Sequence, residues 1–216
     1  MNRRLLSHLF VGLALSASSL LALPVSAADE APDVLIKRLS TDVLDSIKAD
    51  KTIQSGDVSQ IVVLVDNKIM PNVNFPRMTA SAVGPAWRQA TPEQKKRLQD
   101  EFKILLVRTY AGALTQVSDQ VIVVKPLRAA AEDKEVVVRT EVKGRGDPIQ
   151  LDYKLEKTPG EGAGWKIYNL NVLGVWLVET YRSQFAQEIY AKGLNGLIAT
   201  LVDRNKANAN ASAKKG

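Results

Sequence analysis

The side chains that could do chemistry in this 216-residue chain are mostly carboxylates, because the sequence contains no cysteine and a single histidine. Adjacent acids occur at Asp100/Glu101 and Glu132/Asp133, but neighbouring carboxylates on a helix or turn usually face solvent. The acids are not clustered at the loop spacing that a Ca²⁺ site requires. No nucleophile-elbow, dinucleotide-binding or P-loop motif occurs. These residue types argue against an enzyme, and we expect no metal and no cofactor.

The N-terminus has the pattern of a secretory signal peptide. Arg3 and Arg4 precede an apolar run over residues 9–23, and Val25-Ser26-Ala27 offers a small-x-small cleavage site. The only histidine, His8, lies in this segment, so the mature protein would have no imidazole base and no His/Cys zinc site. We therefore expect a protein of the periplasm that is stabilised by packing, without disulfides.

Length and charge narrow the classes further. The formal net charge is +6, and no Lys/Arg run is interleaved with aromatic residues, so nucleic acid is not an expected partner. No second apolar stretch approaches the roughly 20 residues that span a bilayer. We expect a signal peptide at 1–27, a single α+β domain at 28–205 and a disordered basic tail at 206–216, because the tail has no apolar residues to bury.

Helical spacing dominates from Pro32 to about Val117. Asp57 is placed to cap the second helix, and Pro71 to end it. The clearest helix start is Thr91-Pro92-Glu93-Gln94, which combines an N-cap hydroxyl, a proline in the first turn and a capping-box glutamine. A long helix is expected to follow from there.

The apolar period changes to two after Ser118, which predicts strands at 121–124, 136–142, 149–155 and 165–172. The last of these is apolar on both faces, so we expect it to be central. Helical spacing returns at Val178, Gly193 breaks that helix, and a last short helix is expected at 194–201. The order predicts an α+β fold in which a four-stranded curved antiparallel sheet is covered by helices from both ends of the chain.

The apolar sides of the sheet and helices point toward one space, which is either a filled core or a hollow. A filled core is the ordinary outcome, and a hollow would create a site for an apolar ligand. The side chains expected to line it are Leu105, Leu106, Tyr110, Leu151, Tyr153, Leu155, Ile167, Leu170, Val172, Val175, Trp176 and Tyr181.

Several segments resemble the MlaC family, whose members are often labelled toluene-tolerance or ABC-transporter auxiliary proteins. They lie at Trp87–Gln94 (Trp-Arg-x-Ala-Thr-Pro-Glu-Gln), Arg108–Ala111, Gly174-Val175 and Gly193–Ile198. The resemblance extends over essentially the whole mature chain. One departure is Asn74, where this family often carries an aspartate, so any role of a carboxylate there is in doubt.

The resemblance implies a periplasmic carrier that shuttles phospholipid between an outer-membrane lipoprotein–porin complex and an inner-membrane ABC transporter with its substrate-binding component. It also implies a nuclear-transport-factor-like half-barrel with an added helical layer, whose cavity holds the acyl chains. Such a carrier is most simply a monomer. Arg108, Arg139 and Arg145 are candidates for the headgroup, since arginine pairs well with phosphate, although each could be an ordinary surface charge.

Three other classes remain open from the residues alone. The first is a binding module of the same fold for another small apolar solute, which would have a smaller cavity. The second is a small periplasmic enzyme, which would have a polar, carboxylate-lined pocket. The third is a structural adaptor with a filled core and an exposed apolar patch.

Overall fold

The computed structural model describes residues 30–130 and 132–213, so the expected signal peptide lies outside the described residues. The elements, in chain order, are α1 (Pro32–Ala49), α2 (Lys51–Gln54), α3 (Val58–Leu64), the π-helical turn η1 (Val65–Ile69), the 3₁₀ turn η2 (Met70–Asn72), α4 (Phe75–Val83), the 3₁₀ turn η3 (Gly84–Gln89), α5 (Pro92–Leu114), β1 (Val121–Val124), β2 (Glu135–Lys143), β3 (Ile149–Lys157), β4 (Trp165–Val172), β5 (Val175–Trp176) and α6 (Leu177–Ala213).

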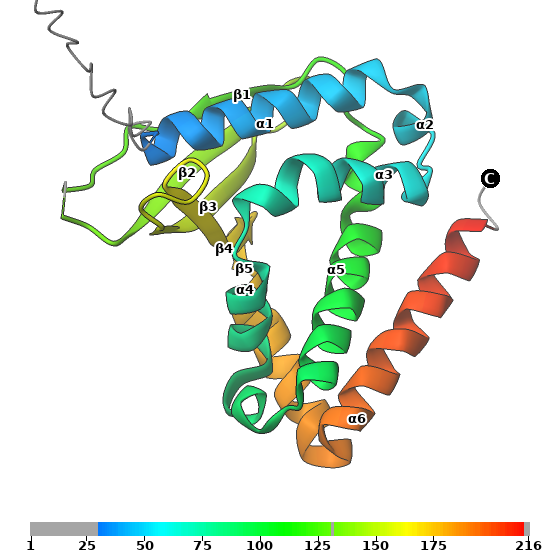
Figure 1. Ribbon diagram of the computed structural model, residues 1–216. Coiled ribbons are helices and arrows are strands. Elements are labelled where there is room, and N and C mark those ends of the chain that lie inside the picture. The colour runs from blue at the N-terminus through cyan, green and yellow to red at the C-terminus, as the bar shows by residue number, and fades with distance from the viewer. Residues whose placement is uncertain (1–29, 131, 214–216) are drawn as a thin grey trace, which may run out of the picture.

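The sheet is antiparallel and open, with strand order β1-β2-β3-β4-β5. Three expectations need correction. The sheet has five strands instead of four, and it is not strongly curled, so it does not form the expected half-barrel (Figure 1). β4 also lies next to the edge strand and not at the centre. The additional strand, β5, has only two residues, which is too short to produce a period-two pattern in the sequence.

The register assigns each side chain to one of two faces. Residues directly opposite each other in an antiparallel pair point to the same side, so the pairs Val138–Tyr153 and Tyr153–Leu170 share one face, the inner face. Tyr168 is an extra residue in β4, because Lys154 and Leu155 pair with Asn169 and Ile167. This β-bulge keeps both Ile167 and Leu170 on the inner face.

Helices pack against the sheet in two groups (Figure 1). α1 packs against β1 and β2, while α4 and α6 pack against β4. The first group forms an apolar sheet cluster around Leu35, Ile36 and Val138. The second forms a helical cluster in which the Phe102 ring lies edge-on to Tyr181 and Phe185, at centroid distances of 5.0 and 5.3 Å. A third cluster joins α1, α2, α3 and α5.

Local sequence signals explain several helix ends. The Thr91 hydroxyl accepts from the Gln94 backbone N–H (3.2 Å) and the Gln94 side chain accepts from the Thr91 N–H (3.0 Å), so the expected capping box is confirmed. Asp57 caps α3 as expected. Gly193 breaks the helical path of α6 with φ +69°, a conformation that glycine adopts without strain.

The C-terminal part of α6 differs from the expected disordered tail, because the helix continues to Ala213. Buried Asn205 gives a physical reason. Its amide donates to the backbone oxygen (3.0 Å) and the carboxylate (2.7 Å) of Glu101 on α5. This contact, which we call the α5–α6 clasp, ties the second half of α6 to α5. The alanines that follow have high helix propensity.

Candidate functional site

The structure divides the twelve predicted cavity residues among several environments. Leu105 and Tyr181 are buried in the helical cluster, and Leu155 and Ile167 are buried in the sheet cluster. These four behave as filled core. The partly buried residues are the candidates for a ligand surface: Leu106, Tyr110, Leu170 and Val172 beside the helical cluster, Tyr153 beside the sheet cluster, and Leu151 on the inner face.

Four of these side chains, which we call the wedge, come from two elements: Leu106 and Tyr110 from α5, and Leu170 and Val172 from β4. All four pack against the helical cluster, yet each keeps part of its surface accessible. Within the described residues, α5 packs closely against α3, α4 and α6, whereas no strand is among its close neighbours. The wedge therefore consists of partly accessible apolar side chains on α5 and β4, two elements that share the helical cluster without packing closely against each other.

Sequence reasoning missed two residues at this surface. Met70 and Val73, in and just after η2, are partly buried against the helical cluster, and Val73 also packs against the sheet cluster. Val73 forms an isolated bridge with Ile167 of β4, which holds this segment beside the sheet. The sequence offers only a short apolar stretch around Pro71 to indicate these two residues, and the proline there predicts the end of a helix.

The wedge contains polar atoms but no ionisable acid or base that would be charged at neutral pH. Burial, with a smaller contribution from nearby Tyr181, raises the pKa of the Tyr110 phenol. Burial also raises the pKa of Tyr153, against the opposite effect of its hydrogen bonds with Ser40 and Thr140. Both phenols stay neutral, so the surface can contact apolar groups without placing a charge among them.

Two predicted cavity residues lie at β5 and point in opposite directions. Val175 is opposite Val172, so it shares the inner face, and it is 51% exposed. Trp176 is opposite Asn171, on the other face, and Lys154 Nζ lies 4.4 Å from the centroid of its ring. The structure therefore brings Val175 to the edge of the wedge and turns Trp176 away from it.

The three headgroup arginines lie in three different places. Arg108 Nη1 donates to the backbone oxygen of Asn205 (2.8 Å), so this arginine belongs to the α5–α6 clasp. Arg139 is exposed on the outer face, opposite Asp152. Arg145 lies in the β2–β3 turn with 93% of its side chain exposed, 3.4 Å from Asp119. The structure does not bring them together as one phosphate site.

A charged network that sequence reasoning missed joins α4 to the outer face of the sheet. Arg77 pairs with Glu135 (2.6 Å) and with Glu156, and its guanidinium lies 3.6 Å above the Tyr168 ring. Tyr168 in turn donates to Glu135 (2.9 Å). Burial, together with this hydrogen bond to a carboxylate, raises the pKa of Tyr168 to about 12. The network fixes the start of α4 against β2, β3 and β4.

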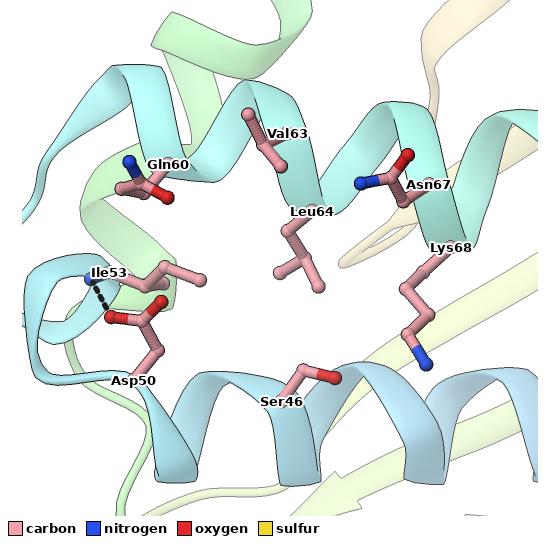
Figure 2. A pocket seen from close by; sticks show the side chains of 8 residues that line it. All are labelled: Ser46, Asp50, Ile53, Gln60, Val63, Leu64, Asn67 and Lys68. Carbon is pink, nitrogen blue, oxygen red and sulfur yellow. Dashed lines mark hydrogen bonds between the residues drawn. The ribbon is translucent and has the colours of Figure 1, made fainter.

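A hollow of about 200 Å³, which we call the α1–α3 hollow, lies between α1, α2 and the α3–η1 segment (Figure 2). Its lining combines apolar side chains with polar ones: Ile53, Val63 and Leu64, and Ser46, Asp50, Gln60, Asn67 and Lys68. The Asp50 carboxylate already accepts from the backbone N–H groups of Thr52 and Ile53 as the cap of α2. Its volume lies below the usual range of ligand pockets, about 300–1,000 Å³, so it is too small to hold two acyl chains.

Two further searches concern the described residues alone. They contain no group of three His, Cys, Asp or Glu side chains that could hold a metal ion. Within residues 30–130 and 132–213, none of the helices combines the length and apolar character that a membrane span requires.

An open antiparallel sheet with helices packed against it, and partly accessible apolar side chains on α5 and β4, define the class of this protein as an α+β fold with apolar surface available to a ligand. A family model described as MlaC protein matches residues 37–203, and the chain belongs to this family.

Individual relatives agree with this assignment. The chain is 28% identical over 171 residues to the Toluene tolerance protein ttg2D of Pseudomonas putida, covering 78% of each chain. It is 24% identical over 203 residues to the Intermembrane phospholipid transport system binding protein MlaC of Haemophilus influenzae, covering 93% of this chain and 94% of the relative. Among solved structures it resembles a phospholipid-binding protein from Ralstonia solanacearum in complex with a phospholipid, with 47% identity, a TM-score of 0.79, and coverage of 82% of this chain and 98% of that chain.

Proposed function

We propose that this protein is a phospholipid carrier of an intermembrane transport system and not an enzyme. The observation that carries the proposal is the accessible apolar wedge, in a chain 47% identical to a protein whose structure contains a bound phospholipid. The acyl chains would lie against the wedge and the inner face beside it, in contact with Leu106, Tyr110, Leu151, Tyr153, Leu170, Val172 and Val175.

The size of the desolvation barrier explains why a carrier is needed. Two acyl chains contain roughly 30 methylene groups, and at about 0.8 kcal/mol each their exposure to water costs about 24 kcal/mol. A protein lowers this barrier only if it offers an apolar surface in place of the bilayer. No bond is made or broken, so the function requires no nucleophile, general base or metal.

The headgroup would remain at the accessible edge of the wedge, near the β2–β3 turn. Among the three candidate arginines we favour Arg145, because its guanidinium is free enough in solvent to reach a phosphate. Arg108 is held in the α5–α6 clasp and Arg139 faces away from the wedge.

The cellular setting is part of the same proposal. A signal peptide at 1–27 would send a single domain, 28–205, to the periplasm. There it would act as a monomer between an outer-membrane lipoprotein–porin complex and an inner-membrane ABC transporter with its substrate-binding component. The name of the Haemophilus influenzae relative supports the transport role. A kinship to nuclear-transport-factor-like folds with an added helical layer is also proposed, although this sheet lacks a half-barrel's curl.

A second candidate is a carrier for a smaller apolar solute, which the name of the Pseudomonas putida relative favours. Cargo size separates the two candidates, because two acyl chains need a pocket toward the upper end of the usual range of about 300–1,000 Å³.

The test is native mass spectrometry of the protein purified from its periplasm without detergent, followed by extraction and lipid analysis. We expect a near-stoichiometric phospholipid. A smaller apolar compound at the same occupancy would favour the second candidate. A protein that is free of ligand, and takes up none from phospholipid vesicles, would contradict both.

A further inference from the structure

Exposed apolar side chains gather at one end of the sheet. Of the seven large hydrophobic residues exposed in the described part of the chain, three lie where β3 begins and β4 turns into β5. These are Ile149 (42% exposed), Leu173 (64%) and Val175 (51%), and we call them the rim patch. The Leu173 N–H donates to the Gln150 backbone oxygen (3.0 Å), which holds the β4–β5 turn beside the start of β3.

Leu173 occupies a backbone conformation that leucine rarely adopts. Its φ is +52° and that of Gly174 is +88°, which is the pattern of a two-residue turn that favours Asn-Gly. Asn171 stabilises the turn, because its side-chain oxygen accepts from the Gly174 N–H (2.8 Å). A leucine here strains the backbone and leaves an apolar side chain in water. Neither effect stabilises the fold, so Leu173 is available for a contact outside the protein.

The rim patch continues the wedge to the outside. Val175 is opposite Val172, and Val172 is opposite Leu151, so these apolar side chains share the inner face up to its edge. Leu173 lies at the tip of the turn that joins them. A lipid that entered or left the wedge at this edge would pass over the patch. This step rests on the proposed function, whereas the exposure and the strain do not.

The charges beside the patch are balanced. Arg145 lies 3.4 Å from Asp119, and Lys143 lies 3.4 Å from Glu141. Lys125 also lies beside Glu141 (2.7 Å), so these three cations share two carboxylates. Two further acids lie nearby: Asp147 is exposed in the β2–β3 turn, and buried Asp152 accepts from the Gln150 side chain (2.7 Å). The surface offers no strong positive field for an anionic membrane and no strong field for a charged protein partner. Apolar side chains among balanced charges suit a surface of zwitterionic lipids.

We propose that the rim patch is a membrane-contacting surface, in which Leu173, Val175 and Ile149 insert shallowly among the headgroups of a zwitterionic phospholipid bilayer. Leu173 inserts furthest because it lies at the tip of the turn. The contact is weak and reversible, since a few buried side chains provide far less membrane affinity than an anchor. It would place the edge of the wedge against the surface from which a lipid is taken or to which it is returned.

The test is flotation of the full-length mature protein with vesicles of phosphatidylcholine and phosphatidylethanolamine at millimolar lipid, in low and high salt. Leu173→Asn is the informative variant, because asparagine suits this turn and removes the apolar side chain. We expect it to lower vesicle partitioning about fivefold, as loss of one partly inserted leucine would, without lowering the thermal unfolding midpoint. The control is Val34→Asn on α1, which removes an exposed apolar side chain (51%, against 64% for Leu173) away from the patch.

Three results would overturn the proposal: no binding of the wild type to these vesicles, equal binding by Leu173→Asn, or binding only to anionic vesicles that disappears in high salt. Lipid bound to the same preparations is measured in parallel. A full lipid complement without vesicle binding contradicts the rim patch alone, whereas a protein that never holds lipid contradicts the proposed function.

Discussion

Asn74 illustrates how one side chain can serve two contacts at once. Its side-chain oxygen accepts from the Arg77 N–H (3.0 Å) and so caps α4, while its amide donates to the Glu156 carboxylate (2.6 Å). An aspartate at this position could cap the helix but would set a second carboxylate against Glu156. The asparagine thus fits its neighbours in this chain, and its part in the structure is to hold α4.

Val175 tests the edge of the wedge. We expect Val175→Glu to lower the phospholipid content of the purified protein severalfold, because a carboxylate on the inner face opposes acyl chains. The measurement is lipid per protein after extraction, with Val175→Leu as the apolar control. A glutamate variant that kept a full complement would place the acyl chains elsewhere.

Glu135 links the Arg77 network to pH. The Arg77 guanidinium, and then the Tyr168 hydroxyl, donate hydrogen bonds that lower the pKa of Glu135 below its ordinary value. Because the folded pKa is lower than the unfolded one, of about 4.3, the ionised carboxylate adds stability above the unfolded pKa. This contribution is lost as the pH falls through the folded pKa.

Glu135→Gln should therefore reduce the loss of folding stability at acid pH, which we call the acid limb of the stability curve. We expect the free energy of urea unfolding to fall less between neutral pH and roughly pH 3 in the variant than in the wild type. Salt should shrink the difference, since Glu135 is half-exposed. Identical acid limbs in the two proteins would mean that the Arg77–Glu135 pair adds no stability.

At the scale of elements, α5 is the part most fully predictable from sequence. It has a capping box, a proline in its first turn and a long apolar stripe, and each of these features depends only on residues close together in the sequence. No capping motif or apolar period in the sequence predicts β5, the η1 turn or the continuation of α6 beyond Lys206. The Arg77 network was invisible for a related reason, because its partners lie 58 and 79 residues away in the chain.

Thr91→Ala should destabilise the protein by about 1 kcal/mol, the usual cost of losing an N-cap hydroxyl. Chemical unfolding in urea measures this change, and Thr91→Ser should retain most of the stability because it keeps the acceptor. An alanine variant as stable as the wild type would show that the capping box is dispensable for α5.

The α5–α6 clasp gives a second prediction at this scale. Asn205→Ala removes both hydrogen bonds to Glu101 and leaves a buried carboxylate with fewer partners, a change that costs about 1–3 kcal/mol. Amide hydrogen exchange should speed up in residues 195–213 more than elsewhere. Asn210→Ala, an exposed change on the same helix, is the control, and equal exchange in both variants would contradict the clasp.

For the whole molecule, the question raised by the sequence was whether the space under the helices is filled or hollow. The answer is divided. Leu105, Tyr181, Leu155 and Ile167 belong to filled clusters, whereas the wedge residues remain accessible. The register places the predicted residues of β3 and β4 on one face, whereas Trp176 lies on the other. Sequence periodicity could not separate the filled group from the accessible one, because that depends on how α5 packs relative to the sheet. A helix's distance from a sheet is set by long-range packing, which no local pattern records.

The most direct measurement is to load the protein with a phospholipid that carries a photoreactive group near the end of one acyl chain, then map the crosslinks by mass spectrometry. We expect crosslinks at the wedge, in the peptides that contain Leu106, Tyr110, Leu170 and Val172. Crosslinks confined to the α1–α3 hollow, near Ser46 and Lys68, would contradict the wedge as the acyl-chain site.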